Sequence, residues 1–182
     1  MSSDPVLRET LKWVDDIVVG MGLCPFAGAS IKADGLRLTL CAATGIDGLC
    51  RVLIDELIFL QSREGEAYDS SLLVHPNVLT DFAAFNEFLG MCEDILVGLS
   101  LEGEFQIASF HPDYCFADAD KDDVGNYTNR SPYPTLHLLR EASITKAIAD
   151  YPDPASIPEK NVEKLEALGA VAMQGKLRGC KD

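Results

Sequence analysis

The sequence FQIASFHPDYCFADADKDDVGNYTNRSPYPTLHLLRE, residues 105–141, decides the fold of this chain. It begins with a short apolar run, Phe105 to Phe110, whose length and composition are typical of a buried strand. The run stops at His111-Pro112, and a long loop rich in Asp, Asn and Tyr follows. In α/β proteins, functional side chains gather in loops beyond the strand ends. The stretch therefore predicts a site next to a strand of an α/β domain.

On either side of this stretch, helix and strand patterns alternate. Alternating side chains predict a half-buried strand at 36–40, and the apolar run at 72–74 predicts a central one. Asp4 and Asp47 can each cap a helix, and Pro5 suits a first turn. We expect helices at 5–21, 47–65, 80–99, 132–149 and 158–168. This order predicts an α/β fold: a βαβαβ core with a small, mainly parallel or mixed sheet covered by helices, and a helical C-terminal region.

Length and composition are those of one globular domain. The chain has 182 residues, of which 47% are hydrophobic and 24% charged, and this fits a single domain over 1–182. We expect its core at about 5–169 and a frayed tail at 170–182. No apolar run approaches the roughly 20 residues of a membrane span, and the N-terminus lacks the features of a signal peptide. These features predict a soluble protein that has no membrane partner.

Charge and cysteine content narrow the partners and the compartment. The net charge of −14 argues against nucleic acid, because phosphate binding needs clustered Lys and Arg. A small anionic ligand stays open, since an acidic protein can still bind one locally. The six cysteines form no CxxC pair, so we expect free thiols in the cytoplasm or another reducing soluble compartment. The sequence leaves the oligomeric state undetermined.

Two histidines follow predicted strands in equivalent positions. His75 and His111 each come directly after an apolar run, and each precedes a proline that turns the chain away. If the two strands are parallel, both imidazoles lie at the same edge of the sheet. Neutral imidazole is a common metal ligand and a common general base near neutral pH. The other interpretation is that each His-Pro simply ends a strand, with the imidazole bonded to backbone.

The predicted helix at 132–149 suggests a binding site at its start. Ser131 suits a helix cap, whereas Arg130 opposes the helix dipole and is a poor choice for stability alone. Beside free backbone N–H groups, a guanidinium favours a bound carboxylate or phosphate. Tyr114, Asn129 and Tyr133 are the further residues that we expect to hold substrate with Arg130 and Ser131. The other interpretation is that Arg130 pairs with an aspartate of the preceding loop.

Two further residues are weaker candidates. His137 lies four residues before Glu141 and hence on the same face of the predicted helix, so it could be a third metal ligand that Glu141 orients. A simple hydrogen bond on the helix surface would explain this pair equally well. Cys24 precedes Pro25 in a predicted turn, where a thiol could act as nucleophile, metal ligand or haem contact. A packed cysteine in a buried turn is the other interpretation.

Four segments of the chain are similar to one known family. They are GLCPFA at 22–27, LLVHP at 72–76, FQIASFHPDY at 105–114 and YTNRSPYPTLHLLRE at 127–141. Together they resemble the uncharacterised family numbered 1415 among the domains of unknown function, over about residues 6–169. That family has no assigned reaction, so the resemblance implies membership without a mechanism. Its members usually have a residue other than Cys at position 115, which argues against chemistry through Cys115 across the family.

We interpret the chain as a small α/β enzyme that acts on an anionic small molecule. His75, His111 and Asp113 are the expected catalytic residues, in a metal-assisted or acid–base mechanism. The cofactor is unknown: a divalent metal is a candidate, and the chain has no nucleotide-binding motif. Hydrolysis is one candidate reaction, which the sequence does not separate from isomerisation or redox chemistry. The alternative is a non-catalytic regulatory module that binds a metabolite or a cofactor, including haem through Cys24.

Overall fold

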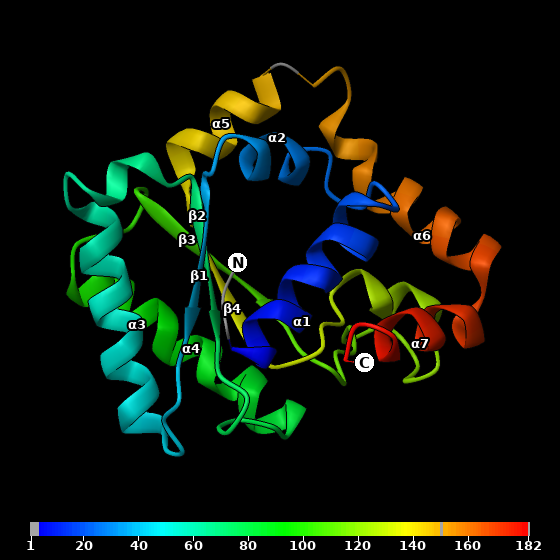
Figure 1. Ribbon diagram of the computed structural model, residues 1–182, viewed down its shortest axis with the longest axis horizontal. Coiled ribbons are helices and arrows are strands. Elements are labelled where there is room, and N and C mark those ends of the chain that lie inside the picture. Colours follow the sequence, from blue (N-terminus) through cyan, green and yellow to red (C-terminus); the bar gives the residue numbers. More distant parts are fainter. Residues whose placement is uncertain (1–3, 150, 182) are drawn as a thin grey trace.

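The computed structural model describes residues 4–149 and 151–181, and within them four strands form one mixed sheet in the order β1–β2–β4–β3 (Figure 1). The strands are β1 (Leu36–Leu40), β2 (Ser70–Val74), β3 (Phe105–Phe110) and β4 (Thr135–Arg140). β1 and β2 pair in parallel, and β4 pairs antiparallel with both β2 and β3. Three strands therefore run in one direction and β4 runs in the other. The expected α/β fold is confirmed.

Helices surround this sheet on both faces. They are α1 (Pro5–Trp13), a π-helix (Val14–Val19), α2 (Ala27–Lys32), α3 (Ile46–Gln61), α4 (Phe82–Gly98), α5 (Glu141–Ala149), α6 (Ile157–Leu168) and α7 (Ala170–Arg178), with short 3-10 helices at Gly65–Ala67, Val124–Thr128 and Pro154–Ser156. Asp4 caps α1 as expected, because its carboxylate accepts the Val6 N–H at 2.8 Å. The predicted cap of α3 was wrong: Gly45 precedes the helix, and Asp47 lies in its first turn.

The predicted helix at 132–149 was wrong in its first half. Residues 135–140 form β4 in the middle of the sheet, and the helix begins only at Glu141. Leu136 and Leu138 are fully buried on one face of the sheet, while Leu139 lines a cavity on the other. A strand that is buried on both faces has an apolar run without alternation, which resembles a helical pattern.

One face of the sheet packs against α3 and α4. Its core contains Leu73 of β2, Leu136 of β4 and Phe105 of β3, all buried, together with Leu53 of α3 and Phe85 of α4. Figure 1 shows these two helices together on one side of the strands. Burying a leucine or phenylalanine stabilises a fold by about 2 kcal/mol, so this layer accounts for a large share of the stability.

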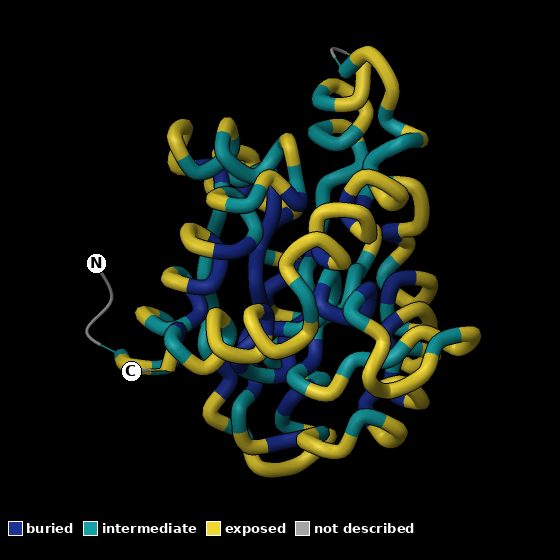
Figure 2. The backbone as a smooth tube through the Cα atoms, turned by 90° about the vertical axis from the view of Figure 1, so that its right-hand side faces the viewer, coloured by how far each residue is buried: buried dark blue, intermediate teal, exposed yellow. Residues whose placement is uncertain are grey.

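The opposite face packs against α1, the π-helix and the C-terminal helices. Its core joins Trp13 and Ile17 to Leu165 of α6, Met173 of α7 and Cys180. The predicted frayed tail was therefore wrong for the described residues up to 181, because Met173 and Cys180 are buried in this core. In Figure 2, buried segments run through the middle of the molecule and exposed segments surround them.

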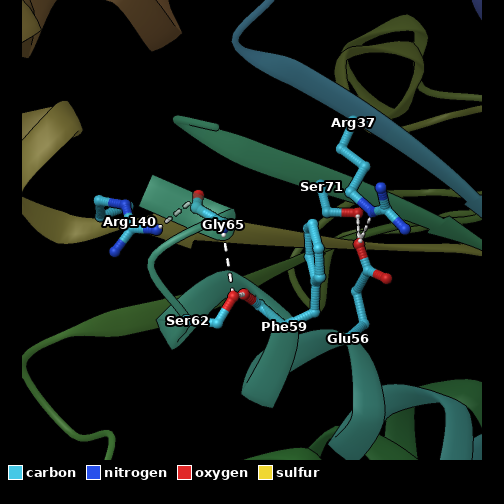
Figure 3. Close-up of polar contacts among 7 residues, drawn as sticks. All are labelled: Arg37, Glu56, Phe59, Ser62, Gly65, Ser71 and Arg140. Atoms are coloured by element: carbon cyan, nitrogen blue, oxygen red, sulfur yellow. Dashed lines mark hydrogen bonds and ion pairs between the residues drawn. The ribbon is translucent and has the colours of Figure 1, made fainter. Parts of the chain in front are cut away.

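Two arginines tie the sheet to α3 through polar contacts (Figure 3). Arg37 donates to the buried carboxylate of Glu56 at 2.8 Å, and Ser71 donates to the same oxygen at 2.6 Å. Arg140 donates to the carbonyls of Leu60 at 2.6 Å and Gly65 at 3.1 Å, where α3 ends. Cations beside the last carbonyls of a helix complement its dipole. Among the described residues, no helix combines the length and hydropathy that crossing a membrane requires.

Candidate functional site

The two strand-end histidines lie at the same edge of the sheet. β2 and β3 run in the same direction with β4 between them, so His75 and His111 both follow carboxyl ends at that edge. Both imidazoles pack against Phe85 of α4, with ring centroids 5.7 Å and 5.1 Å away. The expected common position is confirmed, while a catalytic role stays a prediction.

Hydrogen bonds to backbone define the state of His111. Its Nε2 lies 3.2 Å from the carbonyl oxygen of Leu79, and its Nδ1 accepts the N–H of Asp113 at 3.0 Å. A carbonyl only accepts and an amide N–H only donates, so the ring is neutral with its proton on Nε2. Burial lowers the pKa of His111, which agrees with a neutral ring. Both nitrogens are used, which leaves no free lone pair for a metal or a substrate.

The hydrogen bonds of His75 leave one of its ring nitrogens without a partner among the described residues. It donates from Nδ1 to the carbonyl of Val78 at 3.0 Å, whereas its Nε2 is buried without a partner among the described residues. Burial, with a smaller contribution from nearby His111, lowers the pKa of His75 to about 4. At neutral pH it is therefore an uncharged ring with one unpaired lone pair.

The proposed anion site at a helix start is not formed. Arg130 and Ser131 lie in a loop that leads into β4, so no helix N-terminus adjoins them. Arg130 instead donates to the carbonyls of Tyr114 at 3.1 Å and Lys121 at 2.7 Å, and stacks over Tyr127 at 4.6 Å. Its contacts hold the loop after β3 in place.

Buried Asn126 has a similar role and was not predicted from the sequence. Its amide accepts from the Phe116 N–H at 3.0 Å and donates to the Asp120 carbonyl at 2.8 Å. One asparagine in a polar loop gives no pattern that would single it out.

The other predicted substrate residues are scattered. Tyr133 donates to Glu9 of α1 at 2.6 Å, and burial together with this carboxylate raises the pKa of Tyr133 to about 12. Asn129 donates to the carbonyl of Ser109, and buried Ser131 donates to the carbonyl of Tyr133. Tyr114 packs against Phe82 of α4, and burial raises its pKa. These contacts link the loop to the body of the protein.

A cavity of about 430 Å³ lies on the other face of the sheet. Leu36, Leu72 and Leu139 contribute its floor from three neighbouring strands. α1, the π-helix, α2 and α5 supply most of the remaining lining, and turns and other strand positions supply the rest. α2 and α5 lie near each other at one end of the sheet (Figure 1). None of the described residues of these two short helices is buried.

Two ring nitrogens of the cavity lining have no hydrogen-bond partner among the described residues. They are Nε1 of Trp13 and Nε2 of His137, which we call the orphan nitrogens. Trp13 is only 2% exposed and packs edge-on against Phe110, with ring centroids 5.1 Å apart. Burial lowers the pKa of His137 to about 4, so this ring is also neutral at pH 7. Both nitrogens are themselves buried, so neither is open to the cavity in this structure.

A carboxylate lies at one end of the same cavity. Asp69 accepts from Ser30 of α2 at 2.9 Å and from Ser143 of α5 at 2.8 Å. A Cβ atom on Gly35 would come within 2.5 Å of this carboxylate, so the close approach requires glycine. Ser30, Asp69 and Ser143 were not predicted as site residues because they are 113 positions apart at the extremes and no local motif connects them.

Cys24 and His137 both belong to the lining of this cavity. Both side chains line it, Cys24 from the turn before α2 and His137 from β4. His137 therefore lies on the opposite face of the sheet from His75 and His111, and the three do not converge on one metal site. The predicted helical pairing of His137 with Glu141 was also wrong, because the first lies in a strand and the second begins α5. Within residues 4–149 and 151–181, no three His, Cys, Asp or Glu side chains are arranged to hold a metal.

Comparison with family models identifies the chain. A model described as "Protein of unknown function (DUF1415)" matches residues 5–175. The chain belongs to the DUF1415 family. The match covers both faces of the sheet, so the cavity and the strand-end histidines all lie within the DUF1415 region. Comparisons of the DUF1415 chain with curated proteins and with solved structures gave no match.

Proposed function

We propose that this protein binds a small, largely apolar molecule in the cavity between the sheet, α1, α2 and α5. The observation that carries the proposal is the cavity itself, which measures about 430 Å³ and has a floor of three leucines from neighbouring strands and a carboxylate, Asp69, in its lining. Sites for small molecules typically measure about 300–1,000 Å³ and combine apolar walls with a few polar groups.

The proposal favours the binding interpretation of the sequence over the enzymatic one. The enzymatic hypothesis is supported by the common position of His75 and His111 and by the unpaired nitrogen of His75. Against it, both rings are neutral and buried, and His111 uses both nitrogens on backbone groups. The roles of His75, His111 and Asp113 in acid–base or metal-assisted catalysis stay predictions, as does an anionic substrate.

The haem version of the binding hypothesis concerns the same cavity, because Cys24 lines it. It predicts a Soret band that is lost in Cys24→Ala. The compartment stays an expectation as well: all six cysteines are free thiols, and we expect a reducing environment to keep them so.

The emission of tryptophan tests the proposal directly. Trp13 is the single tryptophan of the chain and borders the cavity, so an occupied cavity should change its fluorescence. We expect saturable changes with small apolar probes such as cyclohexanone, with a gain in thermal stability that follows ligand concentration. Ala147→Phe, which places a ring in the cavity lining, should abolish the response.

The matched control is Ala83→Phe. Ala83 is exposed on α4, which packs on the other face of the sheet. This variant should respond as wild type does. An equal response of wild type and Ala147→Phe would show that the probes bind elsewhere and would contradict the proposal.

A further inference from the structure

β3 is an outer strand of the sheet, because it pairs with β4 alone. Its end shows which backbone groups point away from β4: the Ser109 carbonyl accepts from the Asn129 side chain at 3.2 Å, and the His111 N–H donates to the Asn129 carbonyl at 3.1 Å. Because successive residues of a strand alternate in direction, the N–H and C=O of Ile107 also point away from β4. Neither group has a hydrogen-bond partner among the described residues. The loop after β3 therefore closes one end of this edge and leaves it unpaired at Ile107.

A pocket of about 550 Å³, which we call the edge pocket, lies beside this unpaired edge. Phe105, Gln106 and Ile107 of β3 belong to its lining, and Leu89 and Val97 belong to the part that α4 supplies. Phe105 and Ile107 pack with the core on the α4 face of the sheet. A strand added to β3 would place every second side chain on that same face, next to the edge pocket.

Three exposed carboxylates belong to the lining of the edge pocket: Glu93 and Asp94 of α4, and Glu102 of the turn before β3. These side chains form no ion pair and no hydrogen bond within the described part of the chain. The pocket lining contains no described Lys or Arg, and the sequence has none between Arg63 and Lys121. Unpaired charges of one sign attract a partner of the opposite sign and repel a partner of the same sign.

These features separate the candidate occupants of the edge. A second copy of the chain would bring the same carboxylates together, and this repulsion disfavours pairing between two β3 strands. A small cation would meet the carboxylates but would not pair with the N–H and C=O of Ile107. An extended basic polypeptide supplies the backbone groups and the positive charge together.

We propose that β3 docks an extended segment of a partner protein that is rich in lysine or arginine, and that this segment adds to the sheet as a fifth strand. Its backbone pairs with Ile107. Basic side chains at alternate positions lay their apolar stems along Ile107 and Leu89 and bring their charges to the carboxylates of the edge pocket. This surface lies on the α4 face, so the inference is independent of the cavity and of the proposed function.

Three heptapeptides test the proposal: Ac-TKTKTKT-NH₂, its glutamate counterpart Ac-TETETET-NH₂, and the lysine peptide with every backbone N–H methylated. The readout is the ¹H–¹⁵N spectrum of the ¹⁵N-labelled full chain. We expect saturable binding of the lysine peptide and a downfield shift of the Ile107 amide proton, which gains a hydrogen bond. The methylated peptide keeps the charge but cannot donate to the Ile107 carbonyl, so it should bind about tenfold less tightly.

The triple variant Glu93→Gln, Asp94→Asn and Glu102→Gln tests the charge of the edge pocket. All three side chains are exposed, so we expect the variant to fold as wild type does. Its affinity for the lysine peptide should fall about eightfold, because each exposed ion pair contributes a factor of about two.

The matched control is the triple variant Glu159→Gln, Glu163→Gln and Glu166→Gln. It makes the same change in net charge at exposed positions of α6, a helix that packs on the opposite face of the sheet. This variant should bind the lysine peptide as wild type does. An equal loss of affinity in both triple variants would show that the peptide responds to net charge and not to the edge pocket, and would overturn the proposal.

The other contrary outcomes are distinct. If the methylated or the glutamate peptide binds as tightly as the lysine peptide, the proposal fails, because backbone pairing or positive charge is then not required. A shift of the Ile107 amide that follows protein concentration without peptide would mean that a second copy occupies the edge, against the proposal. Failure of the lysine peptide to bind wild type would also contradict it. None of these results bears on the cavity, which the Trp13 fluorescence experiment tests separately.

Discussion

The ring of His111 has a structural role that can be tested by a single substitution. It bridges the Leu79 carbonyl to the Asp113 N–H and packs against Phe82 and Phe85. We expect His111→Ala to lower the free energy of unfolding by about 3 kcal/mol, because it leaves a cavity and an unpaired buried carbonyl. Urea denaturation measures this.

The control for this prediction is Asp113→Asn. Asp113 is exposed, and its contact with His111 comes from the backbone, which the substitution leaves unchanged. We expect a change within about 0.5 kcal/mol. If His111→Ala were as stable as wild type, the ring would be free for another function, and the catalytic hypothesis would gain weight.

Two histidines also predict how stability depends on pH. Burial lowers the pKa of both His75 and His137 from 6.5 to about 4 in the folded protein. The unfolded chain therefore binds more protons between these values, and stability that is complete above pH 6.5 is lost as the pH falls towards 4. Each ring should contribute roughly 3 kcal/mol to this loss.

His137→Phe isolates one of these contributions. Denaturation at pH 7 and at pH 4.5 should show a smaller loss for this variant than for wild type. At pH 7 the variant should be at least as stable as wild type, because it removes a buried polar group that has no partner in the described part of the chain. An unchanged pH dependence would mean that His137 titrates as an exposed histidine does.

At the scale of elements, Arg140 connects the end of β4 to the end of α3. Its guanidinium donates to carbonyls of Leu60, Gly65 and Tyr68 and stacks over Phe105 at 4.9 Å. We expect Arg140→Met to lower the melting temperature, with a loss of about 2 kcal/mol, because these carbonyls lose a charged donor. Arg140→Lys should recover only part of the loss, because an ammonium lacks the planar fork. Full recovery would show that charge alone matters.

Most of the elements were predictable, because their signals are local. β1 and β3 have the predicted bounds, and Asp81 caps α4 by accepting the Ala84 N–H at 3.0 Å. β4 was not predictable in this way. Its residues follow Pro134 and continue directly into α5, and its apolar run is compatible with a helix of the same length. Pairing with β2 and β3, which is a long-range effect, decides that these residues form a strand and not a helix.

The candidate site was predictable only in fragments. Cys24 and His137 were recognised as individual residues, although no sequence pattern places them in one cavity. Trp13 and Asp69 were missed, because an aromatic residue on an amphipathic helix and an aspartate before a strand are ordinary in those positions. A cavity depends on which faces of distant elements meet. Local patterns do not contain that information.

At the scale of the whole molecule, α7 completes the core on the face of the sheet that also carries the cavity. Met173 is fully buried with Trp13 and Leu165, while neighbouring Val171 is 86% exposed. We expect Met173→Ala to cost about 3 kcal/mol in denaturation experiments and to shift the emission of Trp13, because it opens a void in the core that holds this ring. Val171→Ala is the matched control and should change neither. Similar stability of both variants would show that α7 contributes little to this core.

The position of β4 has a consequence for the order in which the protein can form during synthesis. β4 lies between β2 and β3 although it comes after both in the chain. Until residue 140 has left the ribosome, β3 has no sheet neighbour, and the nascent chain can pair only β1 with β2. His137, Leu139 and the whole of α5 are added at the same late stage. β4, one of the two inner strands, is thus the last strand to be translated, and the cavity cannot exist before the sheet is complete.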